Sequence, residues 1–99
     1  MIEVNKETLE DLVNGNEKVF VYFYSEWNGR SKMMFTTLRV LQNQIDVPIA
    51  ICNIDYNYDL GEIYKVRGLP SFGLVYQGDI VKLESSVITL EFLRNFILE

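Results

Sequence analysis

The sequence predicts an α/β fold, with a central mixed sheet flanked by helices on both faces and elements in the order βαβαβαββα. Residues 19–24 form a continuous apolar and aromatic run, which suits a strand buried on both faces. Strand-like and helix-like segments then alternate to the end of the chain. Because 99 residues suffice for one domain and not for two, we expect a single domain over residues 1–99.

The first half of the chain supplies the central strand and the helices around it. Residues 1–4 predict a short edge strand, and a helix begins at Asn5. Its apolar face is expected at Leu9, Leu12 and Val13. Gly15 ends this helix, and we expect it in the left-handed conformation. The strand at 19–24 then leads into a long helix that ends near Ile45.

The second half predicts three further strands and two helices. We expect a strand at 47–55, a short helix at 59–64, and strands at 72–76 and 80–83. The last two strands flank a compact turn at Gln77-Gly78-Asp79. Ser85 or Ser86 is the expected N-cap of the final helix. The apolar face of that helix is expected at Leu90, Leu93, Phe96 and Ile97.

Charge, hydropathy and cysteine content indicate which partners and which cellular location to expect. The net charge is −5, from 14 acidic and 9 basic residues, which disfavours nucleic acid because binding it requires phosphate neutralisation by Lys and Arg. No apolar run approaches the roughly 20 residues that span a bilayer, so we expect no membrane contact. The N-terminus lacks the features of a signal peptide, and the single cysteine agrees with a cytoplasmic location.

The residue types also limit the chemistry. The chain has no histidine and one cysteine, which removes the usual general base and most soft metal ligands. Neither a phosphate-binding glycine loop nor a dinucleotide fingerprint is present. We therefore expect no metal and no cofactor.

A polar turn follows the central strand and precedes the long helix. It reads Ser25-Glu26-Trp27-Asn28-Gly29-Arg30. Asn28 is the predicted N-cap, since its side-chain oxygen can accept from a free backbone N–H of the first turn. Ligands of open α/β sheets meet the protein at the carboxyl ends of strands, so this turn is a candidate binding site.

This segment resembles the active-site region of the thioredoxin family, in which a central strand runs into Trp-Cys-Gly-Pro-Cys-Lys at the start of a long helix. The framing residues are present as Glu26-Trp27, Gly29 and Lys32-Met33. The two redox cysteine positions fall on Asn28 and Ser31, and the intervening proline falls on Arg30. The segment therefore has the residues that flank the family's active site but not its two cysteines.

Two further segments resemble the same family. Residues 66–71, Val-Arg-Gly-Leu-Pro-Ser, are similar to the family segment whose proline is cis and lies against the active-site turn. The resemblance implies that Pro70 is cis. Asn53-Ile54-Asp55 is similar to a weaker family signature at the end of a strand. Because the element order also agrees over nearly the whole chain, we expect a thioredoxin-like fold.

The departures from the family pattern predict a protein without disulfide chemistry. That chemistry needs a thiolate of lowered pKa and a second, resolving thiol, whereas Asn28 cannot ionise and Ser31 has no evident base. The family's buried Asp and its Lys neighbour correspond to Tyr22 and Ile51, which discard a costly buried charge. These changes favour a naturally redox-inactive member, not an enzyme. The alternative is a thiol-free variant made from an active relative.

The resemblance implies a function in binding a protein or peptide partner, as an adaptor or scaffold module acting through the former active-site groove. The candidate surface comprises Trp27, Asn28, Gly29, Arg30, Leu69 and Pro70. Leu69 offers backbone groups for strand addition, as in the family. The Gly-Ala loop that forms a third wall of the family's groove is missing, because residues 82–85 are expected to form a shorter loop.

Two other functions remain open. One is a residual redox activity through Cys52. The competing interpretation is that Cys52 is a buried, inert side chain between Ile51 and Ile54. The other is a structural subunit whose interface is the edge of the 72–83 hairpin or an exposed helix face. The sequence leaves the partner and the oligomeric state undetermined.

Individual residues near the turn also have two interpretations. Trp27 is either a scaffold residue that packs beside the turn or an exposed anchor for a partner. Arg30 is either a solvated charge or a contact for a partner's carboxylate. We expect three tyrosines to serve packing of the helix and loop, not a ligand site: Tyr56, Tyr58 and Tyr64. Asp55 and Asp59 are expected to serve as helix caps.

Overall fold

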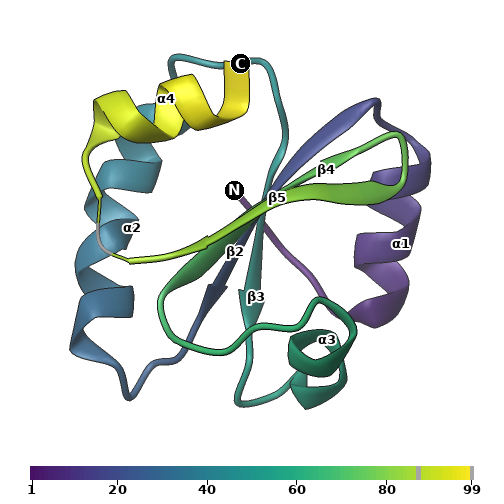
Figure 1. The fold of residues 1–99 in the computed structure, drawn as a ribbon, viewed down its shortest axis with the longest axis horizontal. Helices are drawn as coiled ribbons and strands as arrows, with labels where there is room; N and C mark the ends of the chain where they lie inside the picture. Colours follow the sequence, from purple (N-terminus) through teal and green to yellow (C-terminus); the bar gives the residue numbers. More distant parts are fainter. Residues whose placement is uncertain (87, 99) are drawn as a thin grey trace.

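The structure is a computed structural model that describes residues 1–86 and 88–98, and its elements follow the predicted order (Figure 1). The strands are β1 (Ile2–Glu3), β2 (Lys18–Tyr24), β3 (Ile49–Asn53), β4 (Ser71–Tyr76) and β5 (Asp79–Ser85). The helices are α1 (Lys6–Asn14), α2 (Gly29–Gln42), α3 (Tyr58–Ile63) and α4 (Leu90–Leu98). The predicted fold is confirmed.

The five strands form one mixed sheet in the order β1-β3-β2-β4-β5. β1, β3 and β2 are parallel, because helices connect them, whereas β4 is antiparallel to both β2 and β5. In Figure 1, α2 and α4 lie on one side of the sheet and α1 and α3 on the other. β2 is therefore the middle strand of a sheet covered on both faces.

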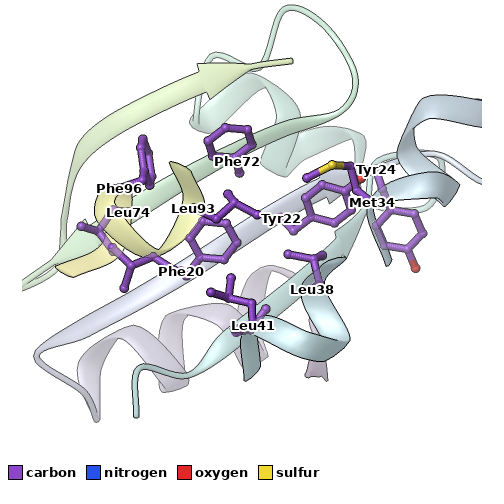
Figure 2. Packing of buried hydrophobic residues seen from close by; sticks show 12 residues of the cluster. Phe20, Tyr22, Tyr24, Met34, Leu38, Leu41, Phe72, Leu74, Leu93 and Phe96 are labelled. Carbon is purple, nitrogen blue, oxygen red and sulfur yellow. The ribbon is translucent and has the colours of Figure 1, made fainter. Parts of the chain in front are cut away.

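Alternate residues of β2 build the two halves of the core. Phe20, Tyr22 and Tyr24 pack with α2, α4 and β4 on one face (Figure 2). The odd-numbered residues of the strand pack with α1 and α3 on the other face: Val19, Val21 and Phe23. The predicted strand, buried on both faces, is confirmed.

Several ends of elements differ from the prediction. The long helix ends at Gln42 and not near Ile45, and β3 covers Ile49–Asn53 and not 47–55. Gly15 has φ −92° and is not left-handed; its N–H donates to the Asp11 carbonyl at 3.1 Å. β5 extends to Ser85, since its pairing with β4 continues to Ser71. Neither Ser85 nor Ser86 caps α4: the Thr89 hydroxyl accepts from the Phe92 N–H at 3.2 Å instead.

The β4–β5 hairpin turn places two residues at positive φ. Gln77 has φ 51° and Gly78 has φ 88°, which is the pattern of a type I′ turn and matches the twist of the flanking strands. A Cβ added at Gly78 would meet no atom within 4 Å. The need for glycine there is therefore conformational and not steric.

We predict that Gly78→Ala lowers the free energy of unfolding by about 1–2 kcal/mol, because an L side chain is strained at positive φ. Chemical denaturation measures the change. Gly29→Ala is the matched control, since a Cβ at Gly29 also meets nothing within 4 Å, there without a positive φ. The control should be neutral or slightly stabilising. Equal effects of the two variants would contradict the prediction.

Candidate functional site

The turn between β2 and α2 is organised by the side chain of Asn28. Its Oδ1 accepts from the Ser31 N–H at 2.9 Å, and its own N–H donates to the Ser25 carbonyl at 3.2 Å. The predicted N-cap is confirmed. A free N–H at a helix N-terminus is a site for an anion, and here the protein's own amide oxygen takes that place.

Ser31, which the resemblance places at the second cysteine position, is fully buried. Its Oγ accepts from the Ser25 N–H at 3.4 Å, and its carbonyl accepts from the Tyr22 hydroxyl at 2.7 Å. Burial raises the pKa of Tyr22. The hydrogen bond from Tyr22 to the Ser31 carbonyl is therefore between uncharged groups, and the Ser31 hydroxyl is not accessible to solvent.

A hydrogen bond joins this turn to the loop after β3. Ser25 Oγ donates to Asp55 Oδ2 at 2.8 Å and accepts from the Trp27 N–H at 3.2 Å. The Asp55 N–H in turn donates to Asn53 Oδ1 at 3.0 Å. Asp55 thus binds the neighbouring loop, and its prediction as a helix cap is wrong. The sequence alone did not reveal this contact, because its partners are 30 residues apart.

The segment before β4 runs alongside the end of β2. The Leu69–Pro70 peptide bond is cis, as predicted. Phe23 pairs with Ser71 in the antiparallel register, so continuing the strands brings Pro70 beside Tyr24 at the start of the turn. Pro70 is buried and Leu69 is half-buried. The fold therefore brings both predicted segments of the candidate surface to one edge of the sheet.

The candidate residues of the turn differ in exposure. Trp27 is 89% exposed, which shows little packing as a scaffold residue. Gly29 and Arg30 are exposed, whereas Asn28 is half-buried. The accessible side chains of the turn are thus the Glu26 carboxylate, the Trp27 indole and the Arg30 guanidinium.

Two tyrosines, one in the loop after β3 and one at the start of α3, are also exposed. Tyr56 is 79% and Tyr58 71% exposed, so their prediction as packing residues is wrong. Tyr64 does pack, with its ring 5.7 Å from that of Phe23. Periodicity could not separate these cases, because the short helix α3 covers the sheet with only one of its faces.

A cavity of about 400 Å³ lies between α3 and the segment that leads to Pro70. Its wall includes the apolar side chains Ile54, Val66 and Leu69. Two exposed cations, Lys65 and Arg67, also line it. Glu62 lines it as well, so the cavity combines an apolar wall with charges of both signs.

The expected loop at residues 82–85 is absent, because these residues belong to β5. They continue the antiparallel pairing with β4 up to the partner of Ser71. Ser85 Oγ donates to the Pro70 carbonyl at 3.3 Å, and a Cβ on Gly68 would lie 2.9 Å from this hydroxyl. A strand with a serine contact thus borders the Pro70 segment on this side.

Cys52 is remote from solvent, as predicted. It lies in β3 and is fully buried. Burial, with a smaller contribution from Asp59, raises the pKa of its thiol from 9.0 to about 12. A thiol in this environment is a poor nucleophile at neutral pH, because the thiolate is the reactive form.

Two searches cover residues 1–86 and 88–98. No cluster of three or more His, Cys, Asp or Glu side chains there could hold a metal ion. No helix in these ranges has the length and apolarity to cross a membrane.

Comparison with known proteins relates this architecture to one family. The family model described as Thioredoxin matches residues 1–99. A thioredoxin of Chlamydia pneumoniae is 34% identical over 80 residues, which are 80% of this chain and 78% of that protein. Mitochondrial thioredoxin-3 of Saccharomyces cerevisiae is 30% identical over 78 residues, but these cover 78% of this chain and only 61% of the yeast protein.

Solved structures agree. A mutant thioredoxin from Halobacterium salinarum superposes with a TM-score of 0.92 at 29% identity, covering 97% of this chain and 86% of that one. The oxidised form of yeast mitochondrial thioredoxin 3 gives a TM-score of 0.87 at 25% identity, with 98% and 92% covered.

We predict that Tyr22→Phe lowers the free energy of unfolding by about 1–2 kcal/mol, because it removes the buried bond to the Ser31 carbonyl. Urea denaturation measures the loss. Tyr76→Phe is the matched control: it removes an exposed hydroxyl that donates to Glu17, and we expect a change within about 0.5 kcal/mol. A Tyr22→Phe protein as stable as the wild type would show that the bond contributes nothing.

We also predict that stability falls as pH rises above about 9. The unfolded chain loses the Cys52 proton near pH 9.0 while the folded chain keeps it until about pH 12, so the folded state binds more protons between these values. Each pH unit then costs up to about 1.4 kcal/mol from this group. Denaturant titrations from pH 8 to 11 measure the slope.

Cys52→Ala is the control for this slope. Tyr22 and Tyr64 also have pKa values raised by burial, so part of the slope remains in the variant and only the thiol's share disappears. Labelling of the wild type with a thiol reagent at pH 8 should proceed only on unfolding. Rapid labelling of the folded protein would contradict the assigned environment of Cys52.

Proposed function

The chain belongs to the thioredoxin family, and from that premise we propose that it is a redox-inactive member that binds a protein or peptide segment through the former active-site groove. The proposal rests on one observation: the sequence has the family's flanking residues at this turn but no cysteine in it. The scaffold residues and the Pro70 segment are retained, while Asn28 and Ser31 stand where the family has its two thiols.

The chemistry of the turn supports binding over catalysis. Disulfide exchange in one chain needs an attacking and a resolving thiol, and this chain has one cysteine, buried in β3. The N–H that an attacking thiolate would use at the start of α2 is bonded to Asn28. Ser31 is buried beneath it. The groups of Asn28 and Ser31 at the base of the turn are thus uncharged and hydrogen-bonded to the protein.

The exposed residues around the turn have the character of a binding surface. Trp27 and Tyr56 lie exposed in the loops that follow β2 and β3, and Tyr58 lies exposed at the start of α3. Such aromatic side chains often dominate protein interfaces. The cavity beside Leu69, which Tyr58 also lines, adds a recess with an apolar wall. An extended segment can place one side chain in this recess and pair its backbone with that of Leu69.

The charges at this surface are of both signs. The protein as a whole carries −5, and Arg30, Lys65 and Arg67 are exposed at the turn and around the cavity. Three exposed acids lie in the same region and balance these cations: Glu26, Asp55 and Glu62. We therefore expect an extended segment whose main contact is an aliphatic or aromatic side chain in the recess.

The test is capture of partners from native lysate with the wild type, Trp27→Ala and Leu69→Asp. We expect a partner that the wild type retains and both variants lose, because one change removes the exposed anchor and the other places a charge at the recess. Quantitative mass spectrometry of the bound fraction measures retention.

Phe92→Ala is the matched control, since Phe92 is a partly exposed aromatic residue on α4, away from the turn. It should retain the partner as the wild type does. A partner that remains bound equally to all four proteins would rule out the groove as the binding surface.

A further inference from the structure

β5 forms an open edge of the sheet. In the described part of the chain its one neighbour in the sheet is β4, and six of its seven residues are exposed. Ile80, Val81 and Leu83 are 38%, 53% and 39% exposed. A long edge with apolar side chains and unpaired backbone groups can be extended by another strand.

The opposite edge of the sheet lacks this property. It is formed by β1, which has only two residues, Ile2 and Glu3. Very short edge strands are one way in which proteins prevent pairing with other chains. The two edges thus differ, and the capacity for strand addition lies at β5.

The hydrogen-bond pattern shows which residues of β5 face outward. At the end of β4, the Gln77 N–H donates to the Glu17 carbonyl before β2 at 2.8 Å, so odd-numbered residues here direct their backbone groups toward β2. Lys82 and Glu84 pair with even-numbered residues of β4. Their backbone groups therefore point inward, and those of Leu83 point to the open edge.

Charge selects the register in which two copies of β5 can pair. In a two-fold antiparallel arrangement, an axis at Lys82 sets Lys against Lys, and an axis at Glu84 sets Glu against Glu. An axis at Leu83 sets each Lys82 opposite the Glu84 of the second copy, and it does so twice. Directly opposite like charges destabilise a sheet and opposite charges stabilise it.

We propose that the protein forms a two-fold dimer in which β5 pairs antiparallel with β5 of a second copy, with Leu83 at the axis. Two sheets of five strands then join into one of ten. Lys82 and Glu84 form two symmetric cross-strand pairs. Leu83 packs against Leu83 of the second copy on the other face.

Contacts within the protein already hold the Lys82 side chain in place. Its Nζ donates to the Phe96 carbonyl at 2.9 Å and lies 5.3 Å from the centre of the Phe96 ring. The ammonium is therefore already ordered, and a Glu84 carboxylate from a second copy can approach without ordering it again. The irregularity in the β4–β5 ladder lies at Leu74 and Val75, toward the hairpin turn, and leaves residues 82–85 regular.

The net charge of −5 on each copy opposes association. We therefore expect a weak dimer that depends on concentration. Sedimentation velocity over a series up to about 1 mM measures its dissociation constant. Glu84→Lys and Lys82→Glu should each weaken the dimer by about tenfold or more, because each replaces both attractive pairs with repulsive ones.

The decisive measurement is a 1:1 mixture of these two variants. In the mixed dimer one copy supplies both positive charges and the other both negative charges, so association should return to the wild-type strength or exceed it. Glu10→Lys makes the same charge change as Glu84→Lys, at an exposed site on α1. It should leave the dissociation constant within about twofold of the wild type.

Circular dichroism establishes that each variant is folded. If Lys82→Glu is unfolded, the comparison of Glu84→Lys with Glu10→Lys still decides. A wild type that stays monomeric throughout the series would overturn the proposal. So would folded charge variants that dimerise as the wild type does, or a mixture of them that stays monomeric.

Discussion

The burial of β2 on both faces is the constraint on which the rest of this structure depends. Its residues alternate between two aromatic and aliphatic clusters, so neither face can be left to solvent without exposing large apolar side chains. Helices must therefore cover both sides of the sheet, as α2 with α4 and α1 with α3 do (Figure 1). The end of such a strand is the first place where the chain can reach the surface, which is where the candidate site lies.

Beneath that site, the turn is held by hydrogen bonds between uncharged groups. The Tyr22 hydroxyl and the Asn28 amide bond to the carbonyl and the N–H of the same residue, Ser31. In the described residues, every buried side-chain nitrogen and oxygen atom has a hydrogen-bond partner. A buried polar group without a partner is costly, so this arrangement keeps the geometry of the turn while requiring neither a thiolate nor a buried charge. The turn is consequently a fixed platform for the exposed side chains around it.

The sequence predicted what depends on local pattern and missed what depends on distant partners. The element order was predicted correctly, the long helix and the buried central strand from their apolar patterns, and a local bond confirmed Asn28 as a cap. The end of β5 was missed because pairing with Ser71 determines it. The role of Asp55 was missed because Ser25 comes from another loop. The exposure of Tyr56 and Tyr58 depends on how far the short helix α3 covers the sheet. The spacing of these residues in the sequence does not predict that.

The strand order has a consequence for how the chain is made. β2 lies between β3 and β4, yet β4 is synthesised about fifty residues after it, so the ribosome releases the central strand long before its second neighbour exists. During that interval, one edge of β2 and much of its aromatic face have no native partner. A nascent chain in this state exposes the kind of surface that chaperones bind and that aggregates form from. The arrangement that encloses β2 most completely at the end of folding therefore leaves it longest without protection during synthesis.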